Sequence, residues 1–256
     1  MKSKLYYAIL LIIGVISMPA KAQKVYPVTS GEIIFSQSNS SFNQSFLNQY
    51  PGAVLQDDNV RFTCFLHIGQ YFHMDFNNSF GMYSGLAIRN VGMITNETLP
   101  QTVSTTGGDV PYSKYNIVRR QYMLGVPLAI KLGSFKNHFY IFGGGEYEMA
   151  FHFKEKYWTD SYDRSGPKTK STEWFASQTP TFIPSVFVGI QFPGGVNLKF
   201  KYYLNDFLDN TYKSGTNSQD GSSFSPSDLT RYQSSQVMYV SLSFQFNTSD
   251  LWEHDR

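Results

Sequence analysis

The stretch FPGGVNLKFKYYLNDF, residues 192–207, alternates two kinds of side chain after a Pro-Gly-Gly turn. Val196 and Leu198 fall on one side of a β-strand, whereas Asn197 and Lys199 fall on the other, because successive side chains of a strand point to opposite faces. The pattern therefore predicts a strand with one apolar and one polar face. Which of these faces meets water and which meets an apolar phase decides the fold class.

The composition indicates that something other than water covers part of the surface. Charged residues make up 16% of the chain and aromatic residues 17%, whereas charged residues are about 25% of ordinary soluble domains. The net charge of +2 argues against a nucleic-acid-binding protein, which would carry a clustered basic excess. Cys64 is the single cysteine, so no intrachain disulfide forms, and we expect it to act as a small apolar side chain within a strand.

The first residues, MKSKLYYAILLIIGVISMPAKAQ, have the features of an export signal. A short basic segment precedes an apolar run, and Ala20-Lys21-Ala22 offers small residues at a cleavage site. We therefore expect residues 1–22 to be a signal peptide, cut before Gln23. The apolar run is shorter than the roughly 20 residues that a transmembrane helix needs.

Eight later stretches have the pattern of strands, and none has sustained helical periodicity. The connections between them are alternately short and long, and the long ones are polar. In an up-and-down meander, all short turns then lie at one end and all long loops at the other, as in outer-membrane barrels. The eight stretches are Gly31–Gln37, Val60–Asp75, Phe80–Ile94, Ile117–Gly133, His138–Lys154, Phe182–Phe192, Val196–Leu208 and Gln236–Phe246. The expected long loops lie near 38–59, 95–116, 155–181 and 209–235, and the short turns at 77–79, 134–137 and 193–195.

Side-chain volume decides which face is inside. An eight-stranded barrel has an interior just wide enough to be filled by side chains, and the apolar stripe carries up to five large residues in one strand, whereas the opposite stripe is rich in Gly, Ala and Ser. We therefore predict an all-β, eight-stranded antiparallel transmembrane β-barrel over residues 23–246, with short periplasmic turns, long extracellular loops and a short periplasmic tail over residues 247–256. Pro127 and Pro184 lie in strands and are expected to mark a bulge or a strand end.

Three segments carry a resemblance to a known family: FGMYSGLAIRNVG (80–92), RRQYMLGVPLAIKLG (119–133) and PSVFVGIQFPGGVNLKFKYYLNDFL (184–208). They resemble the small outer-membrane β-barrel proteins of Bacteroidetes, the porin-family group that includes PorT-like barrels. The resemblance covers most of the chain after residue 22. It implies the barrel architecture and the outer membrane of a Gram-negative cell envelope, and it suggests an accessory role in secretion or envelope assembly. The tail after Phe246 is too short for the peptidoglycan-binding domain of the larger OmpA proteins.

Strand parity places several charged side chains inside the barrel. Because an isolated ion in a low dielectric is very costly, these charges need partners, and we expect an internal ion-pair network that fills the lumen. An acid–base pair or a gate formed by Glu146 and Glu148 is the alternative, although no nucleophile or metal-binding set accompanies the two. The expected network contains Arg89, Lys131, Glu146, Glu148, Lys199 and Lys201. The same parity places His67, His73 and His152 on the inner face.

Aromatic residues gather where the strands meet the two surfaces of a membrane, as in the girdles of outer-membrane barrels. Phe151, Phe153, Tyr202 and Phe207 are expected at the outer rim, and Phe72, Phe80, Phe139, Phe192 and Phe246 at the periplasmic rim. A further set in or beside the third long loop is expected either to contact a partner or to pack on the barrel mouth. This set is Tyr157, Trp158, Trp174 and Phe175.

The sequence thus predicts a non-enzymatic outer-membrane protein that presents surface loops for interaction or serves envelope structure and assembly. Alternatives are a narrow pore or solute channel, a lipid-modifying or proteolytic barrel enzyme, and a soluble ligand-binding barrel. No catalytic residue, metal site or cofactor is expected. The expected partners are outer-membrane lipid and an envelope or secretion protein, and the oligomeric state is left open.

Overall fold

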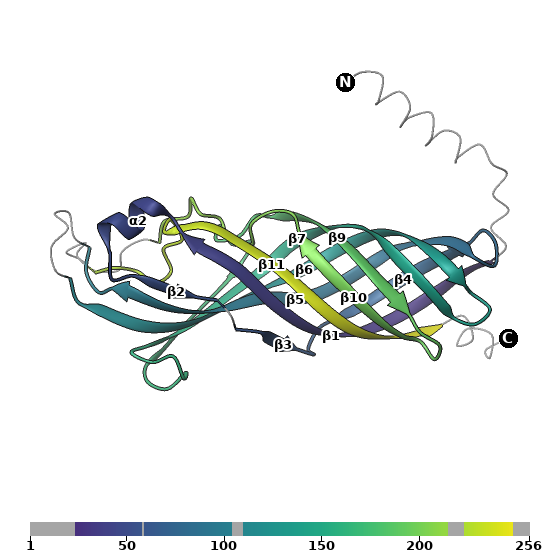
Figure 1. Cartoon of the computed structure of the whole chain (residues 1–256), viewed down its shortest axis with the longest axis horizontal. Helices are drawn as coiled ribbons and strands as arrows, with labels where there is room; N and C mark the ends of the chain where they lie inside the picture. The colour runs from purple at the N-terminus through teal and green to yellow at the C-terminus, as the bar shows by residue number, and fades with distance from the viewer. Residues whose placement is uncertain (1–23, 58, 104–109, 215–222, 248–256) are drawn as a thin grey trace, which may run out of the picture.

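The strands close into a ring. The computed structural model describes residues 24–57, 59–103, 110–214 and 223–247. The predicted signal peptide, 1–22, lies outside the described residues, as do residues 248–256 of the predicted tail, 247–256, whose first residue Asn247 ends β11. The ring follows the order β1-β4-β5-β6-β7-β9-β10-β11, all neighbours are antiparallel, and β11 pairs with β1 to close it (Figure 1). Its strands are β1 (Lys24–Phe42), β4 (Ile68–Asp75), β5 (Phe80–Pro100), β6 (Tyr112–Ser134), β7 (Phe139–Thr159), β9 (Phe182–Gln191), β10 (Val196–Tyr203) and β11 (Tyr232–Asn247).

The outer face of the ring is apolar, as the volume argument predicts. Leu198 and Phe200 of the opening stretch are 44% and 43% exposed, whereas Asn197 and Lys199 are buried. Exposed Val, Leu, Ile and Phe side chains continue this face around the ring, for example Leu128 at 58%. The ring is therefore an eight-stranded transmembrane barrel, because closure satisfies the backbone groups that hydrocarbon would leave unpaired. We call this belt of exposed apolar side chains the apolar band.

Additional elements lie at the long-loop end, in segments predicted to be loops. They are α2 (Gln44–Gln49), β2 (Val54–Gln56), which pairs with β5, and β8 (Lys168–Trp174), which pairs with β7. Asn43 caps α2, since its side chain accepts a hydrogen bond from the amide of Phe46 at 2.7 Å. Figure 1 shows α2 and β2 at the end of the barrel opposite the short turns. In the described part of the chain, no helix is long and apolar enough to cross a membrane.

The second predicted strand, Val60–Asp75, is wrong as one continuous element. It consists of β3 (Arg61–Thr63) and β4, which both pair with β1, and the residues between them are irregular, with Leu66 at a φ of 59°. The prediction for Cys64 is also wrong, because this residue lies in the irregular segment and is exposed.

A bulge in β7 moves one predicted inner residue outward. The register between β6 and β7 shifts between Tyr122 and Met123, so that Tyr122 pairs with His152 and Met123 with Ala150. Phe151 is the extra residue, and the parity of β7 reverses beyond it. His152 therefore leaves the interior, and Phe153, predicted at the outer girdle, is buried.

Two other predictions need correction for different reasons. Phe207, also predicted at the outer girdle, is buried. Pro127 causes no bulge, because Ser84 pairs with Leu128 and Ala87 with Gly125 in one unbroken register. Pro184 does lie near a strand end, since the ladder between β9 and β10 stops at the following residue, Ser185.

Candidate functional site

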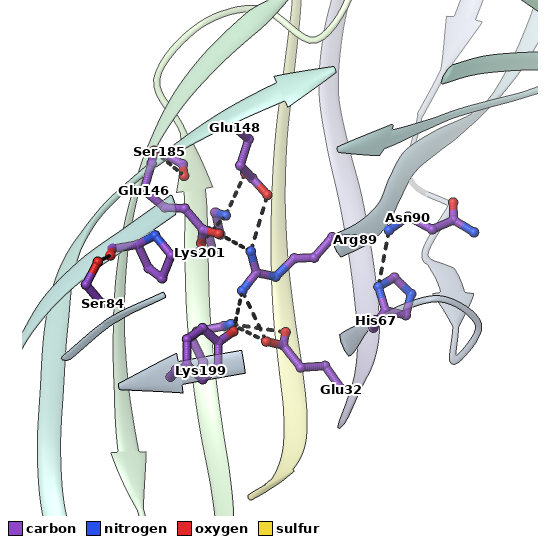
Figure 2. A network of polar contacts seen from close by, with 12 residues as sticks. Glu32, His67, Ser84, Arg89, Asn90, Glu146, Glu148, Ser185, Lys199 and Lys201 are labelled. Atoms are coloured by element: carbon purple, nitrogen blue, oxygen red, sulfur yellow. Dashed lines mark hydrogen bonds and ion pairs between the residues drawn. The ribbon is translucent and has the colours of Figure 1, made fainter. Parts of the chain in front are cut away.

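Six charged side chains meet in the middle of the lumen. Glu32 comes from β1, Arg89 from β5, Glu146 and Glu148 from β7, and Lys199 and Lys201 from β10. Figure 2 shows them turned toward one another around the Arg89 guanidinium. Each side chain is at most 7% exposed. Each lies on the inward-facing parity of its strand, opposite the apolar band. We call this group the mid-barrel network.

Arg89 joins the two halves of the mid-barrel network. Its Nη2 lies 3.2 Å from Glu32 Oε1, and its Nη1 contacts Glu146 and lies 3.4 Å from Glu148 Oε1. Nη2 also donates to the hydroxyl of Tyr71 at 3.0 Å. A guanidinium suits this position because its planar fork presents several donors at fixed angles. Arg89 thus contacts all three carboxylates of the network.

The two lysines complete the pairing. Lys199 Nζ donates to both oxygens of Glu32, at 2.9 and 3.0 Å. Lys201 Nζ donates to Glu146 Oε2 at 2.8 Å and to Glu148 Oε2 at 2.6 Å. Three cations therefore face three carboxylates. This balance is what burial demands, because breaking a buried pair leaves an uncompensated ion.

Lys131 belongs to a separate cluster toward the short turns. Its Nζ lies 2.5 Å from Asp75 Oδ1 and 3.1 Å from His73 Nδ1, and it donates to the hydroxyl of Tyr26 at 3.3 Å. We call Lys131, Asp75, His73 and Tyr26 the short-turn cluster.

A third cluster, which we call the long-loop cluster, lies at the opposite end of the lumen. Arg119 Nε lies 2.7 Å from Glu155 Oε2, and Arg231 Nη2 lies 2.8 Å from Glu97 Oε2. The Tyr232 hydroxyl accepts from Arg119 Nη1 at 2.7 Å and donates to Glu97. All five residues are buried.

Each of the three clusters is electrically neutral, and the middle of the lumen is filled. They hold 3 + 1 + 2 = 6 cations and 3 + 1 + 2 = 6 carboxylates. A cavity beside Glu32, Arg89, Glu146 and Lys199 has a volume of about 10 Å³, and a single water needs at least about 10–15 Å³. Side chains therefore fill the middle of the barrel.

The structure brings five of the six predicted network residues together and places the sixth, Lys131, elsewhere. Sequence reasoning missed Glu32, Asp75, Glu97, Arg119, Glu155 and Arg231. Glu32 and Asp75 could have been found, because both lie in predicted strands at positions whose side chains point inward. Glu97 and Glu155 fall in segments predicted to be loops. Glu146 and Glu148 are each bonded to Arg89 and Lys201, which leaves no open approach for a substrate between them.

The three histidines are not gathered. His67 and His73 are buried inside with different partners, whereas His152 packs edge-on against Trp174 outside, at 4.7 Å between ring centroids. Within the described ranges, no three His, Cys, Asp or Glu side chains are placed to hold a metal ion.

The four aromatic residues near the third long connection do not form one surface. Tyr157 packs against Tyr115 at 6.1 Å between ring centroids, whereas Trp158 lies under the Arg164 guanidinium at 5.8 Å. Trp174 and Phe175 are 67% and 64% exposed. Trp174 pairs with His152 at one end of the β7–β8 ladder, and Trp158 pairs at the other. These two tryptophans are thus about 20 Å apart along the strand, at about 3.3 Å per residue.

Fold and lumen define the class, a small transmembrane β-barrel with a filled interior. No protein-family model matches the chain, and no curated protein matches it in sequence. Among solved structures, it is similar to Ail, the attachment invasion locus protein of Yersinia pestis, with 11% identity over 86% of this chain and 99% of that one, at a TM-score of 0.33. It is similar to the outer membrane protein OprG of Pseudomonas aeruginosa, with 10% identity over 87% and 96% and a TM-score of 0.33. The N-terminal β-barrel domain of OprF from the same organism matches with 8% identity over 85% and 97% and a TM-score of 0.23.

Proposed function

We propose that this chain is a non-enzymatic outer-membrane protein of a Gram-negative envelope, whose plugged barrel anchors a fixed recognition surface. The surface is what we call the cap: α2, β2 and the connections around 175–181, 204–214 and 223–231 at the long-loop end. The observation that carries the proposal is that these segments, distant in sequence, pack on one another.

An aromatic core holds the cap together. Phe46 of α2 lies 5.2 Å from Phe42, 5.1 Å from Tyr50 and 5.8 Å from Phe224, measured between ring centroids. Phe224 comes from the last long connection, so the first and last connections share one core. Buried aromatic pairs contribute about 0.5–1.5 kcal/mol each beyond their area. The core continues into the barrel mouth through Leu99, Phe207, Leu229 and Tyr232.

Polar contacts also cross between the connections. The amide of Asn43 donates to the carbonyl of Arg231 at 2.8 Å, and the amide of Asp209 donates to the carbonyl of Gln178 at 2.9 Å. Gln178 Nε2 donates to the Tyr212 hydroxyl at 3.2 Å. Burial, and then the carboxylate of Glu173, raise the pKa of Tyr212, which keeps this hydroxyl protonated. A surface ordered before binding loses less conformational entropy when a partner arrives.

The filled lumen favours this role over a channel. Six buried cations along the barrel axis are each paired with a carboxylate. Conduction would require these ion pairs to separate in a low dielectric. Purified protein in planar bilayers is expected to give no ohmic single-channel steps. Such steps would overturn the closed-lumen part of the proposal.

Recognition by the cap is tested by purification from gently solubilised, crosslinked outer membranes. The resemblance to PorT-like barrels favours an envelope or secretion protein as the partner. We expect such a protein in stoichiometric amount with the natural chain and with Val188→Ala, which trims a lipid-facing side chain. It should be lost with Phe46→Ala, which loosens the cap core. A folded barrel that brings down no partner in any of the three samples contradicts the recognition role.

A further inference from the structure

The barrel wall has a notch on its long-loop half, between β3 and β5. Pairing of β4 with β5 ends at Ile68–Ile88, and pairing of β2 with β5 begins at Gln56–Asn96. Between Ile88 and Asn96 of β5, hydrogen bonds that involve side chains take the place of backbone pairing on this side of the strand. The amide of Asn90 donates to His67 Nδ1 at 3.2 Å, and the Ser36 hydroxyl donates to the carbonyl of Gly92 at 2.7 Å.

A cavity of about 440 Å³ occupies the notch and has two kinds of wall. One wall is apolar and is formed by Val60, Phe62 and Phe65, which are 57%, 59% and 66% exposed. The other wall is cationic. Its side chains are Arg61, Arg120, Lys154, Lys156 and Arg164.

Arg61 differs from the other buried cations. It is 6% exposed, and its guanidinium donates to the backbone carbonyl of Asn90 at 3.1 Å and to its Oδ1 at 2.8 Å. Every other Arg or Lys that the described residues bury has a carboxylate within ion-pair distance, whereas Arg61 has none there. A buried cation of this kind is costly until an anion reaches it.

More positive charge surrounds Arg61 on the outer face. Arg120 pairs with Lys154 across β6 and β7, and Lys156 pairs with Lys170 across β7 and β8, so these side chains stand beside one another. Over the described ranges, none of these four forms an ion pair with a carboxylate. Like charges at this spacing repel, and an anion with several oxygens would relieve the repulsion.

The position of the notch beside the apolar band favours a lipid phosphate over a free phosphate as the anion. The cations stand beyond the apolar band, and Phe62 and Phe65 extend the exposed apolar surface up to them. A free phosphate in water would use the cations alone. A membrane lipid uses both walls, because its acyl chains meet the phenyl rings while its phosphate meets the guanidinium and ammonium groups.

We propose that the notch binds the phosphorylated headgroup of an outer-leaflet lipid, with a phosphate held by Arg61, Arg120 and Lys154. The inference shares the membrane placement of the proposed function but does not depend on a protein partner for the cap. Loss of the partner and loss of lipid binding are therefore separate results.

The test measures the affinity of purified, detergent-solubilised protein for lipid A carrying two phosphates and for the same lipid after phosphatase treatment. The natural chain is expected to bind the phosphorylated form at least tenfold more tightly. Lys154→Gln/Lys156→Gln, which changes two partly exposed side chains, should lose at least that tenfold preference, as should Arg61→Gln. The matched control is Lys24→Gln/Lys136→Gln, which removes two charges at the short-turn end. It should bind like the natural chain.

Folding of each variant is checked by the migration of unheated and heated samples on a gel. Equal affinity for the two lipids, or equal loss in the control variant, overturns the proposal. Inorganic phosphate is the second probe. If millimolar phosphate binds the notch and the lipid binds no better than phosphate does, the site is a phosphate site and the lipid assignment is wrong.

Discussion

Replacing Arg89 with Met removes the one side chain that contacts all three carboxylates of the mid-barrel network. Met keeps most of the volume and removes the charge. Three carboxylates then face only Lys199 and Lys201, and the lumen gains a net charge of −1. Because removal of one partner from a buried ion pair costs about 3–5 kcal/mol, we expect the free energy of unfolding to fall by about that amount.

A second substitution should restore part of this loss. Glu148→Gln in the Arg89→Met background leaves two matched pairs, Glu32 with Lys199 at 2.9 Å and Glu146 with Lys201 at 2.8 Å. We expect the double variant to recover about 2 kcal/mol, within the coupling found for contacting residues. Asp163→Asn in the same background changes the net charge equally, but at an exposed site, and should recover nothing.

The measurement is urea unfolding of barrels refolded into lipid vesicles, followed by tryptophan fluorescence. The double-mutant cycle with Glu148→Gln alone completes the set. If Arg89→Met stays within about 0.5 kcal/mol of the natural chain, as ordinary surface substitutions do, then the network does not hold the barrel. Equal recovery by Asp163→Asn would show that overall charge, and not pairing in the lumen, sets the stability.

Three further outcomes follow from local geometry. Gly144→Ala should sharply reduce the yield of folded barrel on a heat-modification gel, because the added Cβ would collide with the carbonyl oxygen of Leu128. Gly145→Ala is the control and should fold normally, because its Cβ would lie 3.6 Å from the carbonyl oxygen of Ser185. Tyr232→Phe should raise protease cleavage of the long connections while the barrel stays folded, since loss of its buried hydrogen bonds costs about 1–3 kcal/mol. Cys64 should react with a maleimide in the folded protein, because it is exposed in the break between β3 and β4; protection until denaturant is added would contradict that placement.

The ring of strands could be predicted because its physical signal is local. Period-two alternation fixes which residues share a face, and the volume of stacked side chains such as Leu128 and Ile130 fixes which face is outside. The same parity located Arg89, Glu146 and Glu148 in the lumen. Parity could not assign partners, however, because it does not give the position of a side chain along the axis. Glu146 pairs with Pro127 of β6, four residues away from Lys131 on the same strand.

The long-loop half could not be predicted, because its strands leave the apolar phase. β5 continues to Pro100 and β6 begins at Tyr112, through segments whose outward residues, such as Asn96, Thr98 and Lys114, are polar. Without lipid on one side there is no apolar alternation, so the sequence indicates loops, and Glu97 and Glu155 were missed with them. The bulge at Phe151 could not be predicted from the sequence either, because a residue is extra only in comparison with the partner strand.

The distribution of charge separates the two sides of the barrel wall. Inside, water cannot reach the cations, so each is stable only beside a carboxylate of the same chain, as Lys201 is beside Glu146 and Glu148. Outside and beyond the apolar band, Arg120, Lys154 and Lys156 stand together, and no carboxylate in the described part of the chain forms an ion pair with them. We propose that an anion bound beside these cations supplies the compensation that the described carboxylates do not. The buried guanidinium of Arg61 points to the same conclusion, because solvent alone cannot compensate it.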